Sequence, residues 1–254
     1  MSKYDFNELR GIVERLRKEC PWDREQSNDS IKAATIEEAY EVVHAIDEKD
    51  WPELKKELGD LLLHVVFHSV IAAEDKHFTL DDVIQSISEK LIRRHPHVFG
   101  EVSAEDSETV KKNWEAIKLS EGRKSVTEGI PSSLPSLLRA YRIQEKVAKV
   151  GFDWTDIRDV KKKVDEEIDE LAEAVHHDDH GKIEEEFGDL LFALTNYARF
   201  LKTNPEDALR KANIKFEKRF RYVESRFEEQ NKKIYESTLE EMDIYWEEGK
   251  RKGL

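Results

Sequence analysis

Residues 166–189 read EEIDELAEAVHHDDHGKIEEEFGD, and residues 37–60 read EEAYEVVHAIDEKDWPELKKELGD. Five acids and one Gly recur between the two stretches at a constant displacement of 129 residues, as from Glu38 to Glu167. Chance duplicates an acid-rich helix easily, but it seldom keeps this many residues in register across an intervening loop. The repeat therefore predicts two related halves.

Each copy of the pattern suits a cation site. Acids three or four residues apart share one face of a helix, so each copy directs carboxylates from two consecutive helices toward one another. Like charges at that spacing repel, and a fold tolerates them when a cation sits between them. Hard oxygen ligands in this number suit Mg²⁺ or Mn²⁺. The candidate metal ligands are Glu38, Glu41, Glu57 and Asp60 in the first half, and Glu167, Glu170, Glu186 and Asp189 in the second.

A simpler interpretation exists for any one of these acids, namely a half-exposed carboxylate paired with Lys or Arg. It explains the doubled set less well, because carboxylates beside a core stripe cost several kcal/mol each when left unpaired. Gly59 and Gly188 also sit mid-helix despite a propensity cost of about 1 kcal/mol. They indicate a close helix approach or a ligand beside them.

The composition limits the classes of protein. Charged residues make up 39% of the 254 residues, against roughly 25% in an average globular protein. The formal charge of −14 argues against a non-specific nucleic-acid binder, which needs a basic face. The lone Cys20 fits a reducing compartment, no leader segment is evident, and the longest apolar stretch, residues 61–73, is too short to span a bilayer. We expect a cytoplasmic protein without membrane or nucleic-acid partners.

Helical periodicity dominates and strand alternation is absent, so the sequence predicts an all-α fold of two tandem homologous helical-bundle domains. Residues 121–135 hold two Gly, two Pro and three Ser and read as a linker. The expected domains are therefore residues 1–120 and 136–254. Helices are expected near 30–48, 52–74, 79–94 and 106–119, and then from about 136, near 157–176, 180–202, 205–229 and 238–251.

Basic residues are duplicated as well. Residues 90–94, KLIRR, align with residues 215–219, KFEKR, and each places Lys and Arg four apart on one helical face. Such a pair alone is usually a solvated face, but opposite a carboxylate-bound metal it supplies the positive donors that a polyphosphate needs. Trp246 and Lys250 are also four apart, as are Trp114 and Lys118. Whether the Trp covers a base or simply packs stays open.

Longer strings make the pattern specific. The chain resembles the MazG-type nucleoside triphosphate pyrophosphohydrolases over nearly its full length. The resemblance rests on E-E-x-x-E followed by E-x-G-D in both halves, and on CPWD at 20–23, RRHPHVF at 93–99, VGFDW at 150–154 and KANIKFEKRF at 211–220. It implies an all-α fold, a homodimer, Mg²⁺ dependence, and hydrolysis of (d)NTPs to the monophosphate and pyrophosphate, a house-cleaning of the nucleotide pool.

The resemblance also implies roles for individual residues. Metal binding would fall to the eight acids named above, and triphosphate contacts to Lys215, Arg219, Lys250 and Lys182. The halves differ: Asn196, whose amide could read ribose or base, is matched by Phe67, and Lys182 is matched by Glu53. Together with the resemblance, this favours residues 136–254 as the main catalyst, with Trp246 as a further substrate contact and 1–120 as a second site of open competence.

The expected chemistry is metal-assisted attack of water at the α-phosphorus, because four carboxylates can hold Mg²⁺ that lowers the pKa of water and neutralises the triphosphate. Glu166 is a candidate base or outer ligand, alongside Glu167, Glu170, Glu186 and Asp189. Lys215 and Arg219 would offset the charge that builds on the departing pyrophosphate.

Two alternatives remain at this stage. Glu-x-x-His occurs at Glu41–His44 and Glu173–His176, which is typical of di-iron carboxylate bundles, but the two copies do not align under the repeat. The chain could instead be a non-catalytic helical regulator that only binds nucleotides, which pyrophosphate release on mixing NTP with Mg²⁺ would distinguish. His64 continues the acidic stripe of the first half, although packing explains it better than ligation.

Overall fold

The computed structural model describes residues 4–100 and 125–254, and every regular element in those ranges is a helix. The all-α prediction is therefore confirmed. The chain divides into two compact units, residues 1–110 and 111–254. The helix expected over residues 106–119 lies outside the described ranges.

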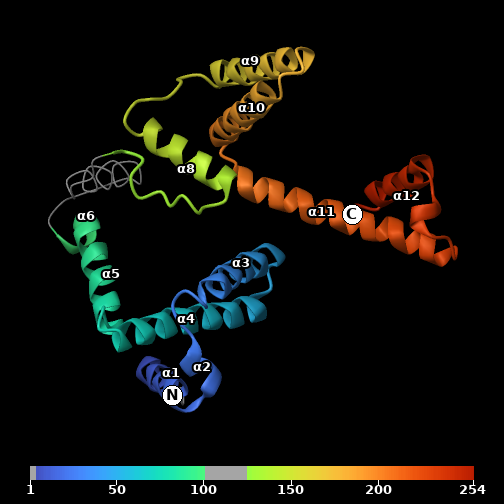
Figure 1. Cartoon of the computed structure of the whole chain (residues 1–254). Coiled ribbons are helices and arrows are strands. Elements are labelled where there is room, and N and C mark those ends of the chain that lie inside the picture. The colour runs from blue at the N-terminus through green and yellow to red at the C-terminus, as the bar shows by residue number, and fades with distance from the viewer. Residues whose placement is uncertain (1–3, 101–124) are drawn as a thin grey trace. The chain divides into compact units, whose positions relative to one another are not determined.

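The first unit contains α1 (Phe6–Glu19), α2 (Pro21–Glu25), α3 (Lys32–Glu48), α4 (Trp51–Glu74), α5 (Leu80–Arg94) and α6 (Pro96–Phe99). Helices α3 and α4 run side by side as a hairpin, and α1 and α5 pack against α4 (Figure 1). A cluster around Val66 and Phe67 of α4, with Val13, Ile31 and Leu80, forms the core. Buried Arg17 ties α1 to α4 through Glu74.

The second unit contains α8 (Ser136–Ala148), α9 (Ile157–His176), α10 (His180–Phe200), α11 (Pro205–Glu229), the short 3₁₀ helix η1 (Ile234–Glu236) and α12 (Leu239–Arg251). The α9–α10 pair forms the most extensive packing in the unit, with α8 against α10, and α12 folds back on α11 (Figure 1). Val160 and Val164 are buried in the first group, and Val223 and Phe227 in the second.

The two acidic hairpins close in the same way. Lys49 ends the α3–α4 turn with a φ of 56°, and Asp178 ends the α9–α10 turn with a φ of 54°. Asp50 and Asp179 then cap the following helices, each accepting a hydrogen bond from a backbone N–H three residues on. The repeat thus extends from the acids to the turn that sets their spacing across the hairpin.

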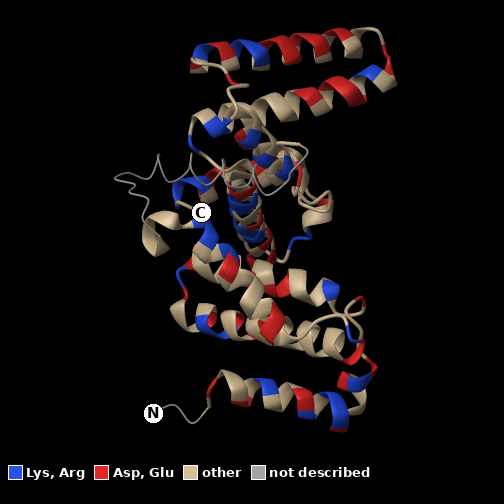
Figure 2. Cartoon of the chain, turned by 90° about the vertical axis from the view of Figure 1, so that its left-hand side faces the viewer, with Lys and Arg blue, Asp and Glu red and all other residues tan. Residues whose placement is uncertain are grey.

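Charge is mixed along the helices. Lys and Arg are interspersed with Asp and Glu in both units (Figure 2), as expected for a net charge of −14. None of the helices in the described ranges combines the length and apolar character needed to cross a membrane.

Candidate active and metal-binding sites

Three carboxylates meet between α9 and α10. Glu167 of α9 and Glu186 and Asp189 of α10 each offer an oxygen, and these oxygens all lie within 4.8 Å of one another. Glu167 is buried, Glu186 is half-buried and Asp189 is exposed. Three oxygen donors from two helices, open to solvent on one side, fit the hard cation that the sequence predicts. These acids can therefore hold a metal ion.

Glu170 lies beside this cluster without joining it. Partial desolvation raises the pKa of the Glu170 carboxyl, and the negative charge of Glu167 raises it further. A fourth acid with a raised pKa is a group that a cation would stabilise in its ionised form. In the structure, however, Glu170 lies outside the three-carboxylate group.

Lys163 supplies the local counter-charge. Its ammonium nitrogen lies 2.8 Å from Oε1 of Glu167, one helical turn away, and it also contacts Glu166. The hydrogen bond to Glu166 and that to Glu167 raise the pKa of Lys163. Sequence reasoning missed this residue, although its spacing of four from Glu167 was the available signal. Glu166 itself is exposed and lies outside the metal cluster.

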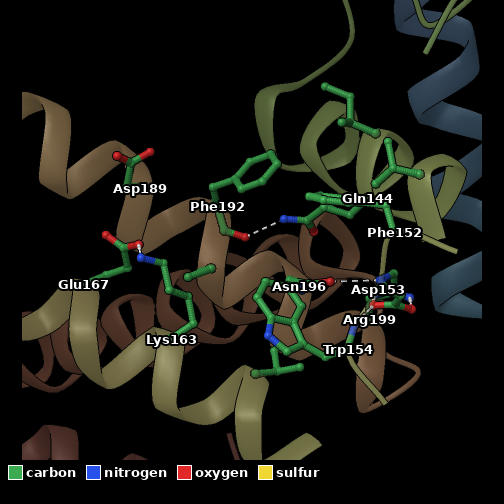
Figure 3. Close-up of a pocket in the computed structure, with 14 residues that line it drawn as sticks. Gln144, Phe152, Asp153, Trp154, Lys163, Glu167, Asp189, Phe192, Asn196 and Arg199 are labelled. Atoms are coloured by element: carbon green, nitrogen blue, oxygen red, sulfur yellow. Dashed lines mark hydrogen bonds and ion pairs between the residues drawn. The ribbon is translucent and has the colours of Figure 1, made fainter. Parts of the chain in front are cut away.

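A cavity of about 480 Å³ opens next to the acids (Figure 3). Glu167 and Asp189 form part of its wall together with Lys163, while Trp154 and Asn196 line the remainder. The cavity thus places carboxylates at one side and aromatic and amide groups at the other. Pockets of this size are typical of small-molecule sites.

The loop between α8 and α9 is tied down over the cavity. Arg199 Nη1 donates to Asp153 Oδ2 at 2.9 Å, and its second nitrogen contacts the other carboxylate oxygen. Arg199 Nε also donates to Asn196 Oδ1 at 2.9 Å. Gly151 turns the loop with a φ of 89°, a conformation that favours glycine. This network holds Trp154 at the cavity wall, which gives residues 150–154 a structural role.

The predicted triphosphate contacts lie elsewhere in the unit. Lys215 and Arg219 are on α11, and Trp246 and Lys250 are on α12. Arg219 Cζ lies 5.7 Å from the Trp246 ring centroid, and Lys250 pairs with Glu247. None of these four residues lines either described hollow that contains the α9–α10 acids. Within the described part of the chain, these four residues therefore form a group apart from the α9–α10 acids.

Lys182 and Asn196 do lie near the acids. Asn196 is buried and lines the cavity of about 480 Å³. Lys182 is exposed and lines a second hollow of about 430 Å³ that also includes Glu170 and Glu186. Of the predicted substrate contacts, these two are the ones that share a surface with the acids.

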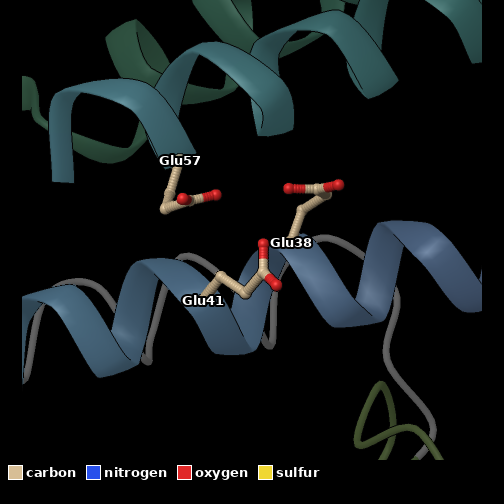
Figure 4. Close-up of side chains that lie close together, drawn as sticks. All are labelled: Glu38, Glu41 and Glu57. Atoms are coloured by element: carbon tan, nitrogen blue, oxygen red, sulfur yellow. The ribbon is translucent and has the colours of Figure 1, made fainter. Parts of the chain in front are cut away.

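The first unit repeats the acidic cluster. Glu38 and Glu41 of α3 and Glu57 of α4 point toward one another across the hairpin, with oxygens within 4.8 Å (Figure 4). Lys56 contacts Glu57 Oε1 at 2.9 Å and holds the pKa of Glu57 below its usual range. Glu57 Oε2 is buried without a hydrogen-bond partner. A buried unpartnered carboxylate oxygen is what a cation would satisfy. Asp60 lies outside this group.

No histidine belongs to either three-carboxylate group in the described residues, although His64 Nε2 lies 3.9 Å from Glu38 Oε1. Thr35 Oγ1 lies 2.9 Å from His64 Nδ1 and 2.8 Å from His68 Nε2, and His68 Nδ1 lies 2.7 Å from Asn28 Oδ1. Burial lowers the pKa of His68. These partners agree with packing roles for His64 and His68. Neither His44 nor His176 belongs to an acidic group in the described residues, so the di-iron alternative finds no support there.

The mid-helix glycines have open surroundings. A Cβ built at Gly59 or Gly188 would meet nothing within 4 Å. The close helix approach considered from the sequence is therefore absent within the described units.

Two segments of the chain match one protein-family profile. The profile described as "MazG nucleotide pyrophosphohydrolase domain" matches residues 26–99 and again residues 156–223. The chain belongs to the MazG family. Both matched segments contain an acidic hairpin, α3–α4 or α9–α10, so the duplication seen in the acids is a duplication of the MazG domain.

MazG relatives align along nearly the whole chain. The protein of Thermotoga maritima named "Nucleoside triphosphate pyrophosphohydrolase/pyrophosphatase MazG" is 47% identical over 250 residues, covering 96% of this chain and 95% of its own. The "Nucleoside triphosphate pyrophosphohydrolase" of Escherichia coli K12 is 46% identical over 258 residues, covering 98% of both chains. A solved mazG-related protein from Thermotoga maritima is 30% identical, covers 44% of this chain and 98% of its own, and has a TM-score of 0.41.

Proposed function

We propose that this MazG-family protein hydrolyses nucleoside and deoxynucleoside triphosphates between the α and β phosphates, releasing the monophosphate and pyrophosphate. Family membership supports this class of reaction, since relatives that align along nearly the whole chain are named nucleoside triphosphate pyrophosphohydrolases. The observation that carries the proposal is that two acids of the carboxylate cluster also line the cavity. Glu167 and Asp189 belong both to the carboxylate cluster and to the cavity that Trp154 and Asn196 line.

Different residues of the second unit would bind the metal ion and accept the proton. Glu167, Glu186 and Asp189, joined by Glu170, would hold Mg²⁺ or Mn²⁺. A bound ion supplies Lewis-acid stabilisation of the phosphate oxygens and lowers the pKa of a water molecule. Glu166 lies next to Glu167 and is the candidate to hold the proton released from the attacking water. Lys163 would compete with such an ion for the Glu167 carboxylate.

Lys215, Arg219, Trp246 and Lys250 form a separate cationic group on α11 and α12. We propose that this group binds the pyrophosphate end of the substrate, where positive donors offset the charge that builds on the leaving group. Because the group does not line the described hollows at the acids, its engagement requires either movement of α11–α12 or a second copy of the chain.

A homodimer is part of the proposal. Phe187, Leu191 and Leu194 follow one another at helical spacing on α10 and are 53%, 40% and 43% exposed, respectively. An apolar stripe on a two-helix hairpin is what a helix bundle covers with further helices. We propose that a second copy covers it. The size of the protein in solution tests this step.

The carboxylates of the first unit have the same spacing as those of the second unit, but the residues around them differ. Phe67 stands where the second unit has Asn196, Glu53 where it has Lys182, and Ala34 where it has Lys163. We propose that this site binds a metal ion but contributes less to turnover. Its carboxylates have the Lys56 ammonium group at Glu57 in place of Lys163 and Lys182, and no amide at the position of Asn196.

The experiment that tests the function is product identification with a panel of NTPs and dNTPs in Mg²⁺. The proposal expects monophosphate and pyrophosphate in equal amounts, and loss of turnover with a chelator. Tight nucleotide binding without any product would instead favour a non-catalytic regulator.

A further inference from the structure

The cavity beside Glu167 contains one polar side chain that the reaction does not explain. Gln144 of α8 is 5% exposed and lies on the cavity wall. Its Nε2 donates a hydrogen bond to the backbone oxygen of Phe192 at 2.8 Å. Its Oε1 is buried without a hydrogen-bond partner. A buried acceptor left unpaired costs about 1–3 kcal/mol, so an unpaired amide oxygen needs an explanation.

The orientation of this amide is fixed by its partner. A backbone carbonyl can only accept a hydrogen bond, so the NH₂ group of Gln144 must face Phe192 and the oxygen must face away from it. Figure 3 shows the Gln144 nitrogen directed at Phe192 and the oxygen on the side of Trp154 and Asn196. The cavity therefore receives an acceptor whose position is set by a hydrogen bond between α8 and α10.

The surrounding wall is suited to a flat aromatic ligand. Phe152, Trp154 and Phe192 contribute aromatic surface to the cavity, and Asn196 contributes an amide. Arg199 holds Asn196 Oδ1, which leaves the Asn196 NH₂ group as the donor on that side chain. Proteins usually recognise a nucleobase outside a duplex by stacking it on aromatic side chains and forming hydrogen bonds to its edge.

We infer that this cavity is the nucleobase pocket of the second unit, and that Gln144 Oε1 accepts a hydrogen bond from an exocyclic amino group of the base. The inference rests on the proposed function, because it assigns the base end of the same substrate. Gln144 is then a specificity-determining residue. Adenine and cytosine, whose amino group stands beside a ring nitrogen acceptor, match an acceptor and a donor together.

Two substrates isolate this contact. Purine riboside triphosphate is ATP without the 6-amino group, and ribose 5-triphosphate has no base. The wild-type protein is expected to favour ATP over purine riboside triphosphate by roughly three- to tenfold in kcat/KM, the range of one hydrogen bond. Gln144→Met keeps the size of the side chain and removes the acceptor, so it should bring that ratio close to one. Ribose 5-triphosphate should be hydrolysed equally by both proteins.

Thr195→Val is the matched control. Thr195 is as buried as Gln144 but donates to the Leu191 carbonyl of its own helix, outside the cavity. Its ATP preference should equal that of the wild type. Far-UV circular dichroism checks that both variants are folded.

The possible outcomes separate the two claims. Equal hydrolysis of ATP and purine riboside triphosphate by the wild type overturns the role of Gln144 and leaves the proposed function standing. So does a folded Gln144→Met protein that keeps the wild-type ratio. If neither nucleotide is hydrolysed, the proposed function fails, and calorimetric dissociation constants for the same two nucleotides decide the Gln144 contact. The wild-type comparison remains decisive even if Gln144→Met does not fold.

Discussion

Lys163 lies 2.8 Å from the carboxylate of Glu167, so the most buried acid of the α9–α10 cluster carries its own positive partner. A divalent ion at Glu167 would compete with this ammonium group for the carboxylate. The charge released from Glu167 would then be available to a phosphate.

Replacing Lys163 by Met should affect metal and substrate in opposite directions. Affinity for Mn²⁺ without nucleotide should rise roughly three- to tenfold, because a competing charge is gone. The kcat/KM for NTP should fall, because a phosphate-facing cation is gone. Titration calorimetry and steady-state rates measure the two effects. Lys161→Met is the control, since Lys161 pairs with Asp165 away from the cavity, and it should change neither. Unchanged or weaker Mn²⁺ binding would refute the competition.

Arg219→Ala should lower kcat/KM if the α11–α12 group contacts the leaving pyrophosphate. The expected loss of transition-state stabilisation is about 2–4 kcal/mol. The variant should stay helical by circular dichroism, since Arg219 is half-buried and contacts the Trp246 ring and the Leu254 carbonyl rather than the buried Val223 and Phe227. Arg221→Ala is the matched control, because Arg221 is exposed and pairs with Glu217 on the same helix. Wild-type turnover in folded Arg219→Ala would show that the group is only a solvated face.

Leu191→Glu tests the proposed dimer. A carboxylate in the middle of the α10 apolar stripe would be desolvated on association, at a cost of several kcal/mol. Light scattering should give about twice 29.8 kDa for the wild type and 29.8 kDa for the variant. Leu239→Glu, at a 77% exposed position at the start of α12, should behave as the wild type. A wild-type protein that is monomeric at micromolar concentration would contradict this part of the account.

The Arg17–Glu74 pair predicts a pH dependence of stability. Hydrogen bonding to Arg17 lowers the pKa of Glu74 below its usual 4.5. A carboxyl with a lowered folded-state pKa stabilises the fold at pH values above 4.5, and this contribution is lost as the pH falls through the lowered pKa. Because Glu74 is 47% exposed, solvent screening limits the effect.

Glu74→Gln should therefore lower the free energy of unfolding by about 1 kcal/mol at pH 7 and by much less near pH 3. Urea denaturation at the two pH values measures this. Glu19→Gln is the control, because Glu19 forms an exposed pair with Arg15, and it should have little effect at either pH. A Glu74→Gln deficit that is equal at pH 7 and pH 3 would contradict the assignment.

The sequence predicted the helices well because their ends are encoded locally. Asp50, Thr79 and Asp179 are good N-cap residues, and each caps the helix expected after it. The acidic hairpins could be predicted because the acids recur at a constant displacement of 129 residues, and both copies form the same hairpin in the structure. Within the described ranges, helix spacing fixed which faces the acids share.

Side-chain rotamers could not be predicted in the same way. Glu41 joins its cluster while the equivalent Glu170 does not, and Asp189 joins while the equivalent Asp60 does not. Spacing selects a helical face but leaves the rotamer undetermined. Gln144 was not considered from the sequence because nothing local marks its amide. Its significance depends on a hydrogen bond to Phe192, which lies 48 residues away.

The central claim is that the α9–α10 carboxylates support water attack at the α-phosphorus. It is tested most directly by hydrolysis of ATP with Mg²⁺ in ¹⁸O-water by the wild type, Glu167→Ala/Glu170→Ala and Glu38→Ala/Glu41→Ala. The account predicts AMP carrying ¹⁸O and equimolar pyrophosphate without ADP. It also predicts a loss of more than about 100-fold in the second-unit variant and much smaller loss in the first-unit variant. ADP and orthophosphate as primary products, or a fully active Glu167→Ala/Glu170→Ala protein beside an inactive Glu38→Ala/Glu41→Ala protein, would contradict it.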